Sequence, residues 1–417
     1  MGKILLMSHC VPPIVRGPSV IINRLFKHFP NDSYVILTSR FDKKIGLEVD
    51  EKLRLPCRYY YTNGETIVGG YKNDFFGRLG KWFEVIPIAM KGAKVAGEEK
   101  CSKVLVCPTH GNFLLAAWLI HKICRKPLYV YFFDLFSSDN DGRRFESFMR
   151  RLVERLVLRS TECAFVMSEK LKDYYQARYL TLNIKIIRHP VDRAEYFPYH
   201  DNDNKRFNPK VGPVKIVFAG MIYEYQIDAI QNLARAVNEL DGVQFHIYTQ
   251  RSKKYLEDMG VCGKNIFHSG YLSNDEIARV QKNADILFLP MTFSHEGINC
   301  DIVKTASPSK IPEYLAAGIP ILIHAPSYSY IAWYANKYEF GLVVDSQDIK
   351  VLKSAISELS KNFDLRKQLI ANAKNLAKAH DISSIFHEFI SGLDMVHQMQ
   401  NICERYDMRR CYETSKR

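Results

Sequence analysis

The sequence lacks the cysteine patterns of metal-binding or disulfide-linked proteins. Its ten cysteines form no C-x-x-C pair and no cluster with histidine at the spacing of a zinc site. They are scattered, mostly within apolar runs, and we interpret them as reduced thiols in the core of a cytoplasmic protein. We therefore expect neither a structural metal ion nor a set of disulfide bonds.

Long hydrophobic runs are also missing. No window of about 18 apolar residues exists, which is the length that a membrane-spanning helix needs. The N-terminus, MGKILLMSHCVPP, has an apolar run too short for a signal peptide and is typical of a first strand. From these features we expect a cytoplasmic protein without a spanning segment.

Basic residues outnumber acidic ones, 58 Lys and Arg against 45 Asp and Glu, which gives a net charge of +13. Such a charge favours anionic partners: nucleic acid, an anionic membrane surface or a phosphorylated small molecule. No zinc-finger, RNP-type or helix-turn-helix pattern supports nucleic acid, and the basic residues are spread along the chain. We therefore expect no nucleic-acid partner and keep the other two classes.

Strand-like and helix-like patterns alternate along the 417 residues, which are too many for one ordinary core. A polar segment rich in Asp, Asn and Pro separates two such series. We predict domains at 1–190 and 214–382, a linker at 191–213 and terminal helices at 383–417. Strands are predicted at 3–8, 33–39, 102–107, 127–133, 163–167 and 184–188, and then at 214–220, 243–249, 265–270, 284–290, 319–323 and 341–345.

The alternation predicts an α/β protein with two Rossmann-like parallel-sheet domains facing each other across a cleft. Ligands of such sheets bind beyond the carboxyl ends of the strands. In the first domain Gly17 opens a helix after the first strand, and this start is either a phosphate contact or a bare turn. His110 and Asp134 each follow a later strand and are candidate catalytic residues, although a lone His is more often structural.

In the second domain, Gly220 follows the first strand, and Gly270-Tyr271-Leu272 follows another. The segment SPSKIPEYLAAGIPILI at 307–323 predicts a short helix capped by Ser307 or Ser309 and ended by Gly318, then a buried strand. Its start, with Lys310, suits an anion. Glu313 could hold a ribose diol, and backbone groups near Tyr271 could contact a base. One nucleotide diphosphate would use all three features.

These features resemble the GT-B glycosyltransferases of family 4, a retaining family that includes many bacterial polysaccharide and lipid-glycan enzymes. The resemblance covers nearly the whole chain and is strongest at 307–345, which is similar to the P-x-K-x-x-E-Y-L-A-x-G-x-P-I-L donor-site signature. It implies that Glu313 holds the donor ribose, that Lys310 binds the diphosphate, and that Asp134 occupies the position of the family's His-Asp pair. The terminal helices would then cross back to the first domain.

The sequence departs from that family at three places. Thr305, rather than the first Glu of the E-x7-E motif, stands eight residues before Glu313, and Glu296 lies farther upstream. Phe133 replaces the His before Asp134. Gly220 is followed by Met-Ile-Tyr instead of the usual Arg and Lys.

The resemblance implies a metal-independent retaining glycosyltransferase, which uses a nucleotide-diphosphate sugar and a glycan or lipid-linked acceptor, in bacterial surface polysaccharide synthesis. Two alternatives remain: a sugar-nucleotide epimerase of the same fold, and an inactive membrane-associated scaffold. Asp139 and Asp141 could mimic a metal motif but are better explained as a helix cap. The segment 75–99 is either a core helix or a basic, aromatic helix that places the protein peripherally on the inner face of the membrane.

Overall fold

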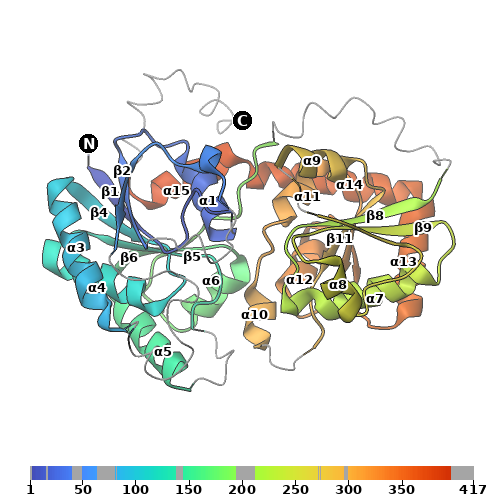
Figure 1. Ribbon diagram of the computed structural model, residues 1–417, viewed down its shortest axis with the longest axis horizontal. Helices are drawn as coiled ribbons and strands as arrows, with labels where there is room; N and C mark the ends of the chain where they lie inside the picture. Colours follow the sequence, from blue (N-terminus) through green and yellow to red (C-terminus); the bar gives the residue numbers. More distant parts are fainter. Residues whose placement is uncertain are drawn as a thin grey trace. The chain divides into compact units, whose positions relative to one another are not determined.

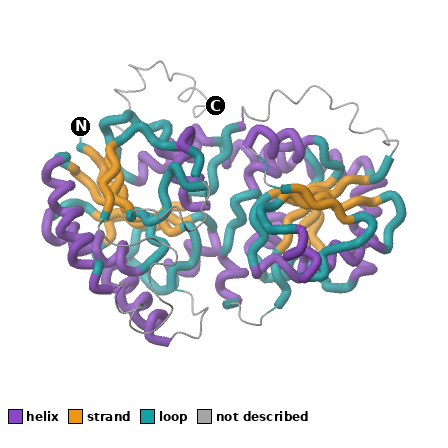
Figure 2. The backbone as a smooth tube through the Cα atoms, in the orientation of Figure 1, coloured by secondary structure: helices purple, strands orange, loops and turns teal. Residues whose placement is uncertain are grey.

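The computed structural model describes residues 2–15, 17–39, 49–62, 80, 82–137, 144–193, 212–270, 272, 274–294 and 299–395. The chain divides into two compact units, Met1–Pro190 with Ile382–Arg417, and Val191–Asp381. In each unit a parallel sheet is covered by helices on both faces (Figures 1 and 2). This confirms the prediction of two parallel-sheet α/β domains. Most of the expected linker, 194–211, lies outside the described residues.

The first unit contains a sheet with the strand order β3-β2-β1-β4-β5-β6-β7 in its described part. Strands β1, β2, β4 and β5 are buried at nearly every residue, because helices cover both faces of the sheet. The strands are β1 (Lys3–Met7), β2 (Tyr34–Thr38), β3 (Arg58–Tyr61), β4 (Cys101–Val106), β5 (Leu128–Phe132), β6 (Thr161–Val166) and β7 (Ile184–Ile186). The helices are α1 (Gly17–Phe26), η2 (Glu51–Leu53), α3 (Val85–Glu98), α4 (Gly111–Cys124), α5 (Arg144–Leu158), α6 (Glu169–Gln176) and α15 (Ile382–Gly392).

The second unit contains a sheet with the order β10-β9-β8-β11-β12-β13. Its strands are β8 (Val214–Ala219), β9 (Val243–Tyr248), β10 (Ile266–Ser269), β11 (Ile286–Pro290), β12 (Ile321–His324) and β13 (Leu342–Val344). Its helices are η5 (Glu224–Gln226), α7 (Ile227–Asn238), α8 (Lys253–Asp258), α9 (Asn274–Lys282), α10 (Cys300–Thr305), α11 (Ile311–Ala317), α12 (Tyr330–Tyr338), α13 (Ile349–Lys361), α14 (Phe363–Ala377) and η6 (Lys378–His380).

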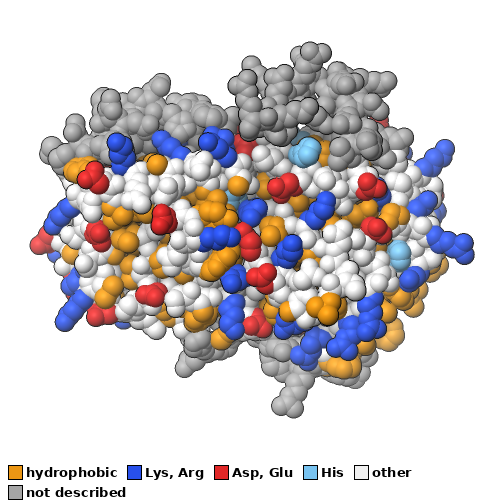
Figure 3. Space-filling view, turned by 180° about the vertical axis from the view of Figure 1, so that it is seen from behind, with side chains coloured by type: hydrophobic (Ala, Val, Ile, Leu, Met, Phe, Trp, Pro, Cys, Tyr) orange, Lys and Arg blue, Asp and Glu red, His pale blue; other side chains and the backbone are white. Residues whose placement is uncertain are grey.

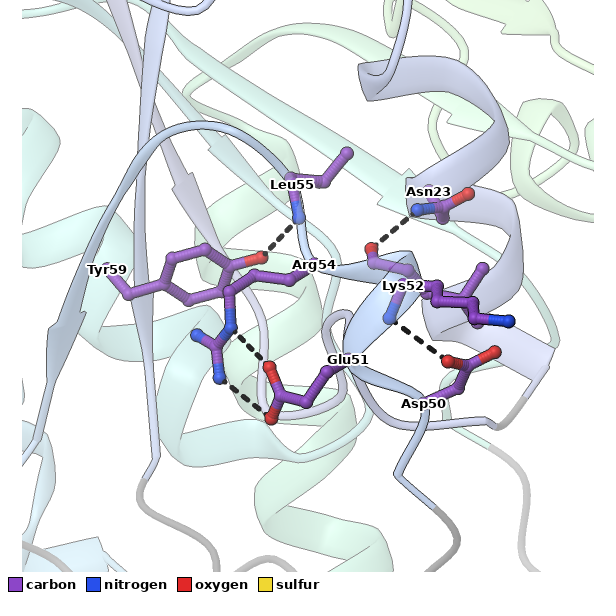
Figure 4. A network of polar contacts seen from close by, with 8 residues as sticks. Asn23, Asp50, Glu51, Lys52, Arg54, Leu55 and Tyr59 are labelled. Atoms are coloured by element: carbon purple, nitrogen blue, oxygen red, sulfur yellow. Dashed lines mark hydrogen bonds and ion pairs between the residues drawn. The ribbon is translucent and has the colours of Figure 1, made fainter.

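The edge strand β3 is not among the strands predicted from the sequence. It reads Arg-Tyr-Tyr-Tyr and is only partly buried, so it lacks the continuous apolar run that marks its neighbours. The segment before it is attached to α1, because Asn23 Nδ2 donates to the carbonyl of Leu53 at 2.7 Å (Figure 4). The N–H of Leu55 in turn donates to the hydroxyl of Tyr59 at 3.2 Å. Local polar contacts therefore position this strand.

A buried carboxylate ties together the amino ends of the strands in the first unit. Glu99 accepts hydrogen bonds from Lys3 at 2.6 Å, Arg58 at 2.9 Å and Tyr60 at 2.5 Å. These donors, led by Lys3, lower the pKa of Glu99 to about 2. The network lies at the end of the sheet opposite the carboxyl ends of its strands, so it serves the fold.

The core of the first unit includes residues from both ends of the chain. Ile385, Phe386, Phe389 and Ile390 of α15 pack with the side chains of α1 and of the central strands. The ring of Phe29 lies 5.1 Å from that of Phe386. The first sheet is therefore complete only when the last described helix covers it.

Candidate functional site

In the second sheet the strand order reverses between β8 and β11: β9 and β10 are added on one side of β8, and β11, β12 and β13 on the other. In a parallel sheet this point opens a crevice at the carboxyl ends of the strands, where ligands bind. Gly220 directly follows β8, and Lys310 precedes α11, which leads into β12. Both residues were predicted to bind the donor.

Lys310 packs against Gly220. The Gly220 backbone has φ +124°, and a Cβ atom there would lie 2.8 Å from Cε of Lys310 and 3.1 Å from its ammonium nitrogen. Only glycine accommodates both the backbone angle and this close approach. The residue type at position 220 therefore makes room for the lysine side chain.

Lys310 is a buried cation. Its side chain sits over the ring of Phe218 in β8, with the ammonium 4.7 Å from the ring centroid, and the residue is only 8% exposed. Burial lowers its pKa to about 8, while nearby Glu313 opposes the shift. An anion placed beside this ammonium would stabilise its protonated form further.

The start of α11 differs from the prediction. Neither Ser307 nor Ser309 caps the helix: Lys310 stands at the N-cap position, without a side-chain cap. The N–H of Ile311 already donates to the carbonyl of Pro308 at 3.1 Å, and Pro312 has no N–H. The start of α11 therefore does not present a row of free backbone donors, and the role of the Lys310 ammonium as an anion partner stays a prediction. The predicted end is confirmed, since Gly318 is left-handed with φ 66°.

Glu313 lies in the first turn of α11 and is half-buried. Its carboxylate accepts a hydrogen bond from Nε2 of Gln281, a buried residue of α9, at 3.4 Å. The carboxylate is therefore held from one side by a neighbouring helix. Its role as the ribose partner stays a prediction.

Thr305 stands at the position of the missing first Glu of the E-x7-E motif. The residue is buried, and its hydroxyl donates to the carbonyl of Asp301, one turn earlier in α10, at 2.6 Å. The hydrogen of this hydroxyl is therefore used within the helix. Glu296, the other candidate, lies outside the described residues.

The predicted base-contacting residues follow β10. Tyr271 lies outside the described residues, whereas Gly270 and Leu272 are described. A Cβ at Gly270 would meet no atom within 4 Å, so packing within the described residues does not demand glycine there. The base contact at 270–272 stays a prediction.

Aromatic and basic residues that the sequence analysis passed over lie after β8 and β9. Tyr223 and Tyr225 stack with ring centroids 5.2 Å apart, and the carbonyl of Tyr225 accepts from the N–H of Thr292 at 2.9 Å. Arg251 donates through Nε and one terminal nitrogen to the carbonyl of Ile222, at 3.3 Å each. The loop after Gly220 is therefore fixed from both sides. Its alternating Tyr residues were the available signal in the sequence.

In the first unit the sheet changes direction between β1 and β4. His110 occupies the N-cap position of α4, immediately after β4, without capping the helix through its side chain. Its ring meets the ring of His9, which follows β1, with centroids 4.8 Å apart. Thr109 Oγ1 lies 3.3 Å from Nδ1 of His9, and Phe113 packs on the same ring. His110 was a candidate from its position in the sequence, whereas His9 was not.

Three more polar or aromatic residues lie around the start of α4, which His110 precedes. Nδ2 of Asn112 donates to Oε2 of Glu84 at 3.5 Å. The ring of Trp82 packs on Gly111, where a Cβ atom would lie only 2.5 Å from it. Indole, carboxylate and amide groups suit a sugar, which presents apolar C–H faces and hydroxyl groups. These residues had no distinguishing pattern in the sequence.

Asp134 follows β5, the strand next to β4. The residue is exposed as a whole, but desolvation of its carboxyl by the surrounding protein raises its pKa to about 6. Asp134 and His110 each follow a parallel strand, so they share the carboxyl edge of the sheet. Phe133, at the position of the family's His, is buried in the core. Gly17 begins α1, and a Cβ there would meet no atom within 4 Å. Arg16, Asp139 and Asp141 lie outside the described residues.

Within the described part of the chain, no three His, Cys, Asp or Glu side chains are grouped so as to hold a metal ion. Nor does that part contain a helix of sufficient length and hydrophobicity to cross a membrane.

Residues 203–376 match the family model "Glycosyl transferases group 1". This range lies entirely within the second unit and includes most of it. No curated protein sequence matches the chain.

Solved structures share the fold over both units. Sucrose-phosphate synthase from Thermosynechococcus elongatus aligns with TM-score 0.68 and 14% identity, over 97% of this chain and all of that one. Anabaena HepE in complex with UDP and glucose aligns with TM-score 0.65 and 13% identity, over 95% and 100%. WaaG, a glycosyltransferase involved in lipopolysaccharide biosynthesis, aligns with TM-score 0.61 and 14% identity, over 92% and 98%. The chain therefore has the GT-B fold of these glycosyltransferases, and the part of it that matches the group 1 glycosyl transferase model lies in the second unit.

Proposed function

We propose that this protein is a retaining glycosyltransferase that moves a sugar from a nucleotide-diphosphate sugar to a glycan or lipid-linked glycan acceptor, without a metal ion. The observation that carries the proposal is Lys310, a buried ammonium beside Gly220 at the switch point of the second sheet. With Glu313 one turn further on, the pair offers a cation for a diphosphate and a carboxylate for a ribose.

In the proposed reaction the bond between the anomeric carbon and the diphosphate oxygen breaks, and its electron pair leaves with the diphosphate. Lys310 stabilises the negative charge that grows on that oxygen, and in this role replaces a metal ion. The acceptor hydroxyl forms the new bond to the same carbon, on the face that the diphosphate leaves, and gives its proton to the departing diphosphate.

The first unit is proposed to bind the acceptor. Trp82 and Glu84 lie around the start of α4, and the His9–His110 pair lies at the carboxyl edge of the sheet, where a sugar hydroxyl could be held. Asp134 lies on the same edge and could steady positive charge on the donor ring or take part in proton movement. This assignment gives each of the two sheets one substrate.

We further propose that the protein works in surface polysaccharide or lipid-glycan synthesis, in the cytoplasm and peripherally on the inner face of the membrane. WaaG, with the same fold, acts in lipopolysaccharide biosynthesis, and the net charge of +13 favours an anionic surface.

Thermal shift and calorimetry with nucleoside diphosphates test the donor site. UDP is the first choice, because HepE was solved with UDP. In EDTA, a nucleotide at 100 times its dissociation constant should stabilise the protein by about 2.7 kcal/mol. Lys310→Met should weaken binding about ten- to a hundredfold. Lys304→Met, an exposed lysine on α10, is the matched control and should bind like the parent.

Stabilisation that appears only with added Mn²⁺ or Mg²⁺ would contradict the metal-free mechanism. Product analysis separates the alternatives. A transferase releases nucleoside diphosphate in proportion to glycosylated acceptor, whereas an epimerase converts the sugar nucleotide with no acceptor present. Failure of every nucleotide to bind would favour an inactive scaffold.

A further inference from the structure

Helix α5 carries two apolar faces instead of one. Val153, Val157 and Leu158 are buried against the first unit. On another side, residues spaced by three or four positions form a second stripe, which is exposed: Phe145 is 41% exposed, Phe148 56%, Leu152 50% and Leu156 39%. A helix that only covers a sheet needs the first face and gains nothing from the second.

The charges beside the exposed stripe are positive. Arg151, Arg155 and Arg159 are exposed along this helix and its end. Of the acidic residues in α5, Glu146 pairs with Arg150 at 3.8 Å, and Glu154 is buried and accepts from the hydroxyl of Tyr179 at 3.0 Å. Figure 3 shows hydrophobic and basic side chains together over α5, at the lower right. The outward surface thus combines apolar side chains with arginine.

The neighbouring helices extend this surface. Helix α4 packs against both α3 and α5, so the three form one layer. Among the described residues, eight of the fifteen exposed large hydrophobic side chains belong to these three helices and the turn before α3. They are therefore gathered on one layer. Besides the four on α5, they are Phe83, Ile86, Met90 and Ile123.

The described part of 75–99 has both a buried and an exposed apolar side. Helix α3 buries Val85, Ile88 and Val95, and presents Ile86 and Met90 outward. The core stripe and the outward apolar stripe are both present, on different sides of one helix.

We propose that the outward side of α5, together with those of α3 and α4, docks on the surface of an anionic lipid bilayer. Apolar side chains would enter the boundary between headgroups and acyl chains, and the arginines would meet lipid phosphates. A second copy fits less well, because a two-fold interface centred on α5 would place this arginine-bearing helix against itself. This inference rests on the proposed function for the location at the membrane, and it adds which surface of the protein contacts the lipid.

Vesicle co-sedimentation with the full chain tests the proposal, without donor or acceptor. The vesicles contain phosphatidylcholine alone, or an equal mixture with phosphatidylglycerol. The parent should partition onto the mixed vesicles, weakly onto neutral ones, and less at high salt. Leu152→Glu combined with Leu156→Glu should lower the partition coefficient by about tenfold per leucine. Arg155→Glu should lower it only on the anionic vesicles.

Val351→Glu on α13 is the matched control, since that residue is 44% exposed and belongs to the second unit. It should bind vesicles like the parent, and circular dichroism should show every variant folded. Parent protein that stays in the supernatant, or a double variant that binds like the parent, overturns the proposal. Self-association that the double variant abolishes, with no vesicle binding, would instead identify a second copy as the partner. Nucleotide thermal shift is measured on the same variants. A loss of nucleotide binding is thereby distinguished from a loss of vesicle binding.

Discussion

Replacing Lys310 by Met should stabilise the free protein while weakening its donor site. Burial lowers the pKa of Lys310 from 10.5 to about 8, which means that the fold disfavours the charged form. At about 1.4 kcal/mol per pKa unit, the cost at neutral pH is at most about 3.5 kcal/mol. Methionine has a similar length and no charge, so Lys310→Met should recover most of that free energy.

The effect has a defined pH window. Between pH 8 and 10.5 the unfolded chain binds more protons at this residue than the folded chain, so parent stability rises with pH across that window. The advantage of Lys310→Met should therefore be largest below pH 8 and vanish near pH 10.5.

Thermal unfolding of the free protein from pH 7 to 10.5 measures this. For a unit of this size the variant should melt roughly 4–10 °C higher at pH 7. Lys304→Met, with an exposed side chain, should leave the melting temperature nearly unchanged. Equal or lower stability of Lys310→Met at pH 7, or a stability difference that does not depend on pH, would refute the argument that this ammonium is buried at a cost.

Four further substitutions test other parts of the structure. Glu99→Gln should destabilise the first unit by about 1–3 kcal/mol above pH 4.5, and the difference should shrink as pH falls toward 2, measured by denaturant titration. Glu313→Ala should weaken nucleotide binding about ten- to a hundredfold in calorimetry; unchanged affinity would remove it from the donor site. Asp134→Asn and His9→Ala should leave that affinity unchanged and lower transfer at least tenfold; equal loss of binding would contradict the acceptor-side assignment.

The strands were predictable because both faces of each sheet are covered. Runs such as Ile4–Met7 and Ile321–Ile323 are apolar at every position, and a buried parallel strand requires this. Strand β3 was missed for the opposite reason: Tyr59 to Tyr61 lie at an edge, partly exposed, where composition is less constrained. The bounds of α11 shifted because Lys310, rather than a serine, precedes its first turn.

Single residues of the candidate site could be predicted from their places next to predicted strands, whereas the contacts between them could not. Gly220 and Lys310 could be found because each lies at the carboxyl edge of a predicted strand or before the next one. Their contact joins segments ninety residues apart, and nothing local encodes it. His9 was missed because its partners, Thr109 and His110, lie about a hundred residues away in the chain. Such pairs follow from strand order, which the sequence leaves open.

The packing of α15 in the first unit has a consequence for synthesis on the ribosome. Phe386 and Phe389 fill the core beside Phe26 and Phe29, yet they are made after the whole second unit. At about 5–20 residues per second, the 191 residues from Val191 to Asp381 take roughly 10–40 s to synthesise. During that time part of the apolar surface of the first sheet stays uncovered, and the second unit has received all of its own chain before α15 is made. The first unit is therefore the first to be started on the ribosome and the last to be completed.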